Sequence, residues 1–160
     1  MKLAICLAGG GVKGAAHIGV LKAIEEANIK YDYISGTSSG SIVASLIAMG
    51  YKSDEIYELF KKYCKKIKHI DFKNVAKLVI GIVLRRSLII DGLNSGEQIE
   101  KIINEAASKK GIYNINQIKV NLFIPSVELN TGMLYMFSSM KKRGIYSDEI
   151  KYVDDISIAK

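Results

Sequence analysis

Apolar residues in the first fifty positions alternate between short continuous runs and helical spacing. The run KLAICLA, residues 2–8, predicts a strand, and the apolar positions after the next glycines recur every third residue, which predicts a helix ending near Asn28. The pattern then repeats: YDYIS, residues 31–35, predicts a second strand, and residues 42–49 predict a helix that Gly50 ends. This order indicates an α/β fold with a mainly parallel central sheet flanked by helices.

Two further helices are predicted in the middle of the chain. Ser53 is expected to cap a helix that carries one apolar stripe. Ser95 and Gln98 form the spacing of a capping box for a fourth helix, which Gly111 would close.

A hairpin is predicted in the last forty residues. Asn130-Thr131-Gly132 is a turn sequence between two β-type runs. Pro125 lies in the first of these runs and cannot donate to a ladder, so we expect that strand to be bulged or at an edge there.

The final residues, DDISIAK, predict the start of a helix without the rest of it. Asp154 or Asp155 can cap a helix at Ile156, yet only about one turn of sequence follows, which is too short to be stable alone. We therefore expect residues 1–160 to form a single α/β domain that is incomplete at its C-terminus.

Composition places the chain among soluble or peripheral proteins. Hydrophobic residues make up 49% of the sequence, which is enough for a sizeable core. The longest apolar stretch, residues 78–84, falls far short of the ~20 residues of a spanning helix. Cys6 and Cys64 both lie in apolar patterns, which suits a reducing compartment. We expect a cytoplasmic protein, and its net charge of +7 leaves a peripheral contact with an anionic membrane open.

The segment Gly36-Thr37-Ser38-Ser39-Gly40 satisfies the pattern G-x-S-x-G between a predicted strand and a predicted helix. In such a nucleophile elbow the backbone turns sharply, the flanking glycines give it room, and the serine stands exposed at the helix N-terminus. The amide of Ser39 then faces the oxygen that becomes negative when an ester carbonyl is attacked. The alternative interpretation is a glycine-rich loop in which Ser38 only caps the helix.

A second glycine motif follows the first predicted strand. Its residues are Gly9, Gly10, Gly11, Val12, Lys13 and Gly14. Backbone amides of such a loop can converge on an anion, so in an esterase they would supply the other half of an oxyanion hole. The oxyanion candidates are therefore Gly9, Gly10, Gly11, Gly14 and Ser39.

The same glycines allow an interpretation from another class of protein. Gly9, Gly11 and Gly14 also fit G-x-G-x-x-G, and Asp32 lies near the position of a ribose-binding acid, so a nucleotide- or dinucleotide-binding module is the alternative. It ranks second because it leaves the G-x-S-x-G segment unexplained. A P-loop does not fit, since Lys13 precedes the last glycine.

With both motifs identified, the sequence resembles the patatin-like phospholipase family. The segment GGGVKGAAHIGVLKAIEE looks like its oxyanion loop and first helix, and GTSSGSIVASLIAMG looks like its nucleophile elbow. The resemblance is looser in VELNTGMLYMF and ISIAK. It implies an acyl hydrolase that acts on lipid esters with a serine-aspartate dyad, in which Ser38 is the nucleophile, and it implies no cofactor.

The catalytic aspartate of that family lies in a D-G-G or D-G-A motif, and the sequence contains neither. Asp91 is followed by Gly-Leu and comes before the hairpin, so we do not assign the role of catalytic aspartate to it. We expect the aspartate to lie outside residues 1–160, and these residues alone to be inactive. A formal Ser38, Asp54, His69 order exists, but His69 is interpreted as solvated and His17 as packed or capping.

Surface features are weaker signals. The third predicted helix carries lysines 61, 62, 65 and 66, with Lys68 just beyond, which favour a solvated helix face over a membrane-docking face. We expect no nucleic-acid partner and no metal, because neither aromatic-basic patterns nor ligand clusters occur. The oligomeric state stays open.

Overall fold

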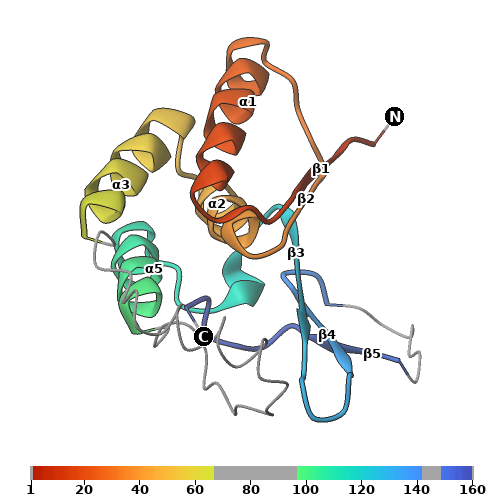
Figure 1. Cartoon of the computed structure of the whole chain (residues 1–160). Helices are drawn as coiled ribbons and strands as arrows, with labels where there is room; N and C mark the ends of the chain where they lie inside the picture. The colour runs from red at the N-terminus through yellow and green to blue at the C-terminus, as the bar shows by residue number, and fades with distance from the viewer. Residues whose placement is uncertain (1, 67–96, 142–148, 160) are drawn as a thin grey trace, which may run out of the picture.

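The computed structural model describes residues 2–66, 97–141 and 149–159. Its centre is a five-stranded sheet in the order β1-β2-β3-β4-β5 (Figure 1). The strands are β1 (Ala4–Leu7), β2 (Tyr33–Gly36), β3 (Asn121–Val127), β4 (Leu134–Ser138) and β5 (Ile150–Val153). β1, β2 and β3 are parallel, β4 is antiparallel to β3, and β5 is parallel to β4, which confirms the mainly parallel sheet.

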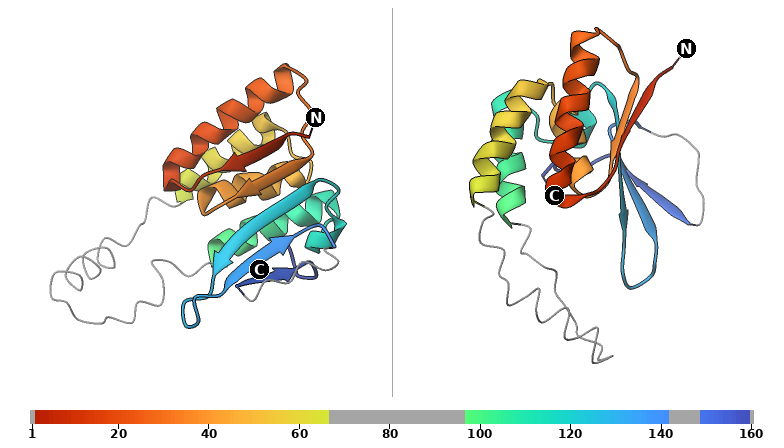
Figure 2. Two further views of the ribbon diagram at one scale, coloured as in Figure 1. Left: turned by 90° about the vertical axis from the view of Figure 1, so that its right-hand side faces the viewer. Right: turned by 45° about the horizontal axis from the view of Figure 1, so that its top comes forward.

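In the described part of the chain, four α-helices lie on one face of this sheet (Figure 2). They are α1 (Ala15–Glu26), α2 (Ser39–Ala48), α3 (Ser53–Lys66) and α5 (Glu97–Lys110). Two short 3-10 helices, η1 (Gly11–Gly14) and η2 (Ile115–Gln117), precede α1 and β3. Within the described ranges, the other face of the sheet carries no helix.

The core lies between the sheet and α2. Ile34 of β2 and Leu122 of β3 are neighbours in the parallel register, and both are 0% exposed. The run 43–47 of α2 is buried throughout, because this helix also contacts α1, α3 and α5. A helix enclosed in this way carries no charged residue and few polar ones, and those of α2 are small serines.

The helix ends follow the predicted glycine and asparagine signals. Asn28 has φ 51°, Gly50 has φ 85° and Gly111 has φ 68°, so each adopts the left-handed conformation that ends a helix. Ser95 and the side chain of Gln98 lie outside the described residues, so the capping box stays a prediction.

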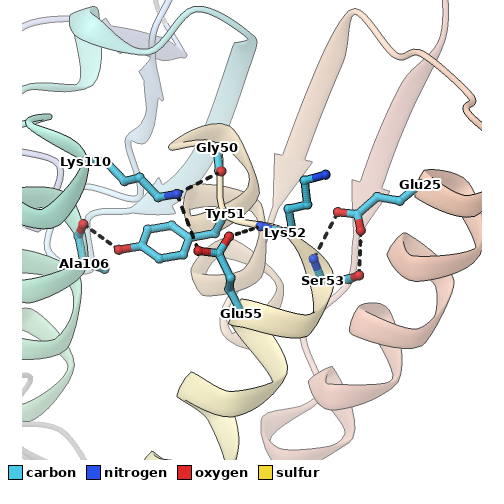
Figure 3. A network of polar contacts seen from close by, with 8 residues as sticks. All are labelled: Glu25, Gly50, Tyr51, Lys52, Ser53, Glu55, Ala106 and Lys110. Atoms are coloured by element: carbon cyan, nitrogen blue, oxygen red, sulfur yellow. Dashed lines mark hydrogen bonds and ion pairs between the residues drawn. The ribbon is translucent and has the colours of Figure 1, made fainter.

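The prediction that Ser53 caps α3 is wrong. Ser53 is itself the first residue of α3, and its amide and hydroxyl both donate to the Glu25 carboxylate of α1, at 3.0 and 2.7 Å (Figure 3). The Glu55 carboxylate instead accepts from the Lys52 amide at 2.7 Å, one residue before the helix. Ser53 is 1% exposed, so it joins α1 to α3 rather than serving as a local cap.

The neighbouring contacts join α5 to the same region. The Tyr51 hydroxyl donates to the Ala106 carbonyl at 2.9 Å, and the Lys110 ammonium lies 4.3 Å from the centre of the Tyr51 ring (Figure 3). Lys110 also donates to the Gly50 carbonyl and pairs with Glu55 at 3.6 Å. These contacts hold α5 against the turn between α2 and α3.

The hairpin prediction is confirmed. β3 and β4 pair from Phe123 with Ser138 to Val127 with Leu134, and residues 128–133 connect them. Pro125 lies beyond Phe123, the last residue of β3 that pairs with β2, so its missing amide hydrogen costs no bond to β2. The expected edge position at Pro125 is therefore present.

The prediction that a helix begins at Ile156 is wrong. Ser157 instead forms an isolated bridge with Asn114, and the Ile156 carbonyl accepts from the Ile115 amide at 3.0 Å. The Asp155 carboxylate accepts from the Asn114 side chain at 2.7 Å rather than capping a turn. Long-range pairing with the segment before β3 thus prevails over the local capping signal.

Candidate active site

Ser38 lies at the sharp turn between β2 and α2. It is exposed and has φ 53° and ψ −126°, a conformation that is rare for a residue with a side chain. The turn is closed behind it by two hydrogen bonds: the Gly40 amide donates to the Thr37 carbonyl, and the Ser41 amide donates to the Ser38 carbonyl, each at 2.9 Å. The structure therefore has the geometry of a strained elbow that presents a hydroxyl to solvent.

The two glycines that flank Ser38 are needed for close backbone approach. A Cβ on Gly36 would overlap the carbonyl of Gly40, and a Cβ on Gly40 would overlap the carbonyl of Leu7 at the end of β1. In both cases the obstacle is backbone, which cannot move aside as a flexible side chain can. The two flanking positions therefore need glycine, Gly36 because of packing within the elbow and Gly40 because of packing against β1.

The glycine loop after β1 lies directly beside Ser38. A Cβ on Gly9 would lie 3.1 Å from Ser38 Cβ and 3.8 Å from its Oγ. Further along the loop, a Cβ on Gly14 would lie 2.8 Å from Ser39 Cβ. The two glycine motifs, more than twenty residues apart in sequence, therefore form one site, because parallel β1 and β2 end at the same edge of the sheet.

Ser39 differs from Ser38 in its surroundings. Ser39 is 9% exposed. Its hydroxyl is buried against Gly14 and has no hydrogen-bond partner among the described residues. Its side chain therefore fills the space between η1 and α2. Only Ser38, of the two adjacent serines, presents its side chain at the surface.

His17 holds the start of α1 near the end of β1. Its Nε2 lies 2.8 Å from the Ala8 carbonyl, and the residue is half-buried. This contact agrees with the structural role expected for His17. Lys13, in the loop itself, is exposed.

A cavity of about 310 Å³ opens beside the elbow on the sheet face without described helices. It lies over the ends of β1, β2 and β3 and extends to β4. Its lining is Cys6, Leu7, Ala8, Ser35, Gly36, Thr37, Phe123, Pro125 and Met136. The volume is at the lower end of the range typical of small-molecule sites, and most of the lining is apolar. Sequence analysis missed the contribution of Phe123, Pro125 and Met136, which the hairpin register brings to this face.

The other candidate residues do not join the site. Asp32 precedes β2, at the opposite edge of the sheet from the glycine loop, and its carboxylate accepts from the Leu3 amide at 3.0 Å. The Asp54 carboxylate pairs with Lys22 at 2.7 Å on the surface. In the part of the chain that the structure describes, the Ser38 hydroxyl has no hydrogen bond to a carboxylate. His69 and Asp91 lie outside that part.

This position of Asp32 argues against the dinucleotide-binding interpretation. In that class of protein the ribose-binding acid and the glycine loop lie at the same edge of the sheet, where the parallel strands end. Here the full length of β2 separates them, although the G-x-G-x-x-G spacing is present.

The fold and the elbow define the class of protein. A family model described as patatin-like phospholipase matches residues 5–144. Since the match spans most of the chain, the chain belongs to the patatin-like phospholipase family, a family of lipid hydrolases, as the sequence motifs predict.

Three relatives show how the similarity is distributed. The lysophospholipase NTE1 of Saccharomyces cerevisiae is 44% identical over 68 residues, which are 42% of this chain and 4% of that protein. NTE1 of Kluyveromyces lactis is 44% identical over 63 residues, covering 39% of this chain and 4% of its own length. The uncharacterized protein YqhO of Bacillus subtilis is 31% identical over 145 residues, covering 88% of this chain and 48% of YqhO. The chain thus spans less than half the length of each relative.

Solved structures share the fold. A chain of the heterodimeric ExoU–SpcU complex of the Pseudomonas aeruginosa type III secretion system superposes with a TM-score of 0.59 at 20% identity, over 99% of this chain and 34% of that chain. A second structure of the full-length complex gives a TM-score of 0.52 at 21% identity, over 84% of this chain and 34% of that one. The predicted fold class is confirmed. No helix in the described ranges has the length and apolar character needed to cross a membrane.

Proposed function

We propose that this domain is the N-terminal part of the catalytic domain of a serine acyl hydrolase that cleaves carboxylic esters of lipids. The observation that carries the proposal is the exposed Ser38 in a strained turn, with Gly9 of a separate loop against its side chain. Such a turn holds a nucleophile in a fixed orientation at a helix N-terminus. Family membership supports lipid esters as the substrate class.

In the proposed reaction the Ser38 hydroxyl oxygen attacks the ester carbonyl carbon. Its proton passes to a base and then to the leaving alcohol as the ester bond breaks, which gives an acyl-enzyme. Water then attacks this ester, releases the carboxylic acid and restores the Ser38 hydroxyl.

The negative oxygen of each tetrahedral intermediate would be held by backbone amides. The proposed donors are the Ser39 amide at the start of α2 and the amides of the glycine loop, namely Gly9, Gly10, Gly11 and Gly14. Fixed donors of this kind need not reorganise as charge develops, and removing one typically costs about 2.7–4 kcal/mol in the barrier. Gly36 and Gly40 would act indirectly, by allowing the turn that aims Ser38.

The base would be an aspartate outside residues 1–160. This part of the proposal is supported by the absence of a D-G-G or D-G-A segment from these residues and by the bonds of Asp32 and Asp54, whose carboxylates pair with Leu3 and Lys22 and not with Ser38. A serine without a base is a weak nucleophile, so the 160 residues alone are expected to turn over no ester.

The cavity beside the elbow would receive the acyl chain. Its lining includes Thr37 and Ala8, the neighbours of Ser38 and Gly9 in sequence. Phe123, Pro125 and Met136 add apolar side chains from the hairpin strands. The protein would act in the cytoplasm, with peripheral contact to the membrane that holds its substrate, and would need no cofactor.

Ester turnover tests the proposal. The full reading frame that contains these residues is expected to hydrolyse a lysophospholipid or a soluble p-nitrophenyl ester, and the Ser38→Ala variant is expected to lose that turnover. Gly19→Ala, on an exposed and open position of α1, serves as a matched control that keeps it. Undiminished turnover in correctly folded Ser38→Ala protein would overturn the proposal.

A further inference from the structure

The turn of the β3–β4 hairpin, residues 128–133, lies at the same edge of the sheet as Ser38. β2 and β3 are parallel, so the residues that follow each strand emerge on the same side. Residues 124–127 of β3 pair with β4 but not with β2, so the turn extends past the end of β2. In the left view of Figure 2 this turn and the start of α1 lie on the same side of the molecule.

The hairpin turn and the last residue of β3 present aliphatic side chains to solvent. Leu129 is 94% exposed and Val127 is 57% exposed. At the same edge Val12, in the glycine loop, is 75% exposed. Single exposed apolar residues are common, but these three occupy one edge, and that edge is the one that carries Ser38.

Several polar groups of the turn are paired with one another. The Glu128 carboxylate accepts from the amides of Asn130 and Thr131, each at 3.0 Å, and from the Thr131 hydroxyl. The Gly132 amide donates to the Glu128 carbonyl at 2.8 Å, and the Met133 amide to the Thr131 hydroxyl at 3.2 Å. A polar group that is paired loses less when it leaves water, so these bonds reduce the cost of bringing the Leu129 tip to a lipid surface, where the charged Glu128 carboxylate would stay at the level of the hydrated head groups.

We propose that the hairpin turn 128–133, with Leu129 at its tip, docks the protein on a phospholipid bilayer and so turns the Ser38 edge toward the membrane. This inference rests on the proposed function, because lipid esters lie in bilayers. We favour a bilayer over a protein partner, because the proposed substrate class lies in bilayers and the exposed apolar side chains at this edge are aliphatic. The net charge of +7 adds attraction to anionic lipid.

Tryptophan fluorescence tests this docking directly, because residues 1–160 contain no tryptophan and the signal can be taken as the difference from the unsubstituted full-length protein. Leu129→Trp would place the one tryptophan of residues 1–160 at the tip. Ile29→Trp is the matched control: Ile29 is also exposed, at 47%, but it precedes β2 at the opposite edge. With vesicles of phosphatidylcholine and phosphatidylglycerol, the Leu129→Trp emission is expected to shift to shorter wavelength and to be quenched by brominated lipid.

The Ile29→Trp emission is expected to stay unchanged with the same vesicles. An unshifted Leu129→Trp emission, or an equal shift in both variants, would overturn the docking proposal. A shift produced by another protein but not by vesicles would also overturn it and favour a protein partner.

Vesicle co-sedimentation provides a second measurement. Leu129→Glu is expected to weaken binding on the order of tenfold to a hundredfold, as loss of one buried leucine contact should, whereas Ile29→Glu leaves it unchanged. Equal binding by both variants would contradict the proposal. Ester turnover of the unsubstituted protein tests the proposed function separately: if turnover is absent while Leu129→Trp still shifts, the hydrolase proposal fails and the docking surface stands.

Discussion

Gly9 and Ser38 approach so closely that a single methyl group on Gly9 would lie 3.1 Å from Ser38 Cβ and 3.8 Å from Oγ. A methyl there is tighter than ordinary contact, so Ser38 or the loop must shift by a few tenths of an ångström. Gly9→Ala is therefore expected to keep the fold and to slow the reaction of Ser38 with a fluorophosphonate on the order of 10²-fold, because the amide donors move relative to the attacked atom.

The control for this prediction is Gly19→Ala in α1, where an added Cβ meets open space. Its labelling rate is expected to match that of the unsubstituted protein. A Gly9→Ala variant that labels at the full rate would show that the contact between this loop and Ser38 has no role in reactivity.

Gly36→Ala is expected to lower the stability of the fold as well as to disturb the orientation of Ser38. Its Cβ would overlap the Gly40 backbone in the elbow, so the turn must open, at a cost of about 3 kcal/mol or more. Gly19→Ala, in an exposed helix interior, should instead stabilise the protein by about 0.5–1 kcal/mol. Urea unfolding of the two variants measures the difference, and equal midpoints would contradict the packing account of the elbow.

Sequence reasoning predicts the parts of the fold that local signals determine. The two strand-turn-helix units, the helix ends at Asn28 and Gly50, and the hairpin all follow from periodicity and turn chemistry, and the structure confirms them. The elbow is equally local, since Gly36 and Gly40 flank Ser38 in sequence. The roles assigned to these residues stay predictions.

What could not be predicted depends on long-range pairing. Ser53 carries a capping signal, yet its partner is Glu25 on another helix, and Asp155 pairs with Asn114 instead of starting a helix. The cavity depends on the register that sets Pro125 opposite Met136. No spacing along the chain encodes these contacts, because each joins segments whose relative position only the folded sheet fixes.

The Glu128 carboxylate supplies a pH-dependent test of the hairpin turn. Its pKa is lowered from the ordinary value of about 4.5, chiefly by the Thr131 hydroxyl and then by the Asn130 amide, which donate to the charged form. The folded turn therefore favours the charged carboxylate, and this contribution is present above the ordinary pKa and is lost as the pH falls through the lowered one.

An NMR titration of the Glu128 carboxyl is expected to show a midpoint below the ordinary value, with the amide shifts of Asn130 and Thr131 following it. Thr131→Val removes the hydroxyl and should move the midpoint upward. An unchanged midpoint in that variant would show that the turn is not organised by this carboxylate.

Cys6 allows a test of the cavity without changing its backbone. The thiol lies on the exposed face of β1 and lines the cavity with Phe123 and Met136. Alkylation with N-ethylmaleimide should fill that space, and so slow labelling of Ser38 by a long-chain alkyl fluorophosphonate on the order of tenfold, with little effect on a methyl one. Cys6→Ser protein, treated in the same way, is the control and should show no such difference. If alkylation slows labelling by both fluorophosphonates equally, the acyl chain does not bind in this cavity.

Site-resolved fluorophosphonate labelling tests the central claim most directly. In the full reading frame that contains these residues, peptide mass spectrometry is expected to find the phosphonyl adduct on Ser38 and not on its neighbour Ser39, whose hydroxyl is buried. The Ser38→Ala protein is expected to carry none while it unfolds at the same temperature. An adduct on another residue, or none on the folded unsubstituted protein, would contradict a serine nucleophile at this elbow.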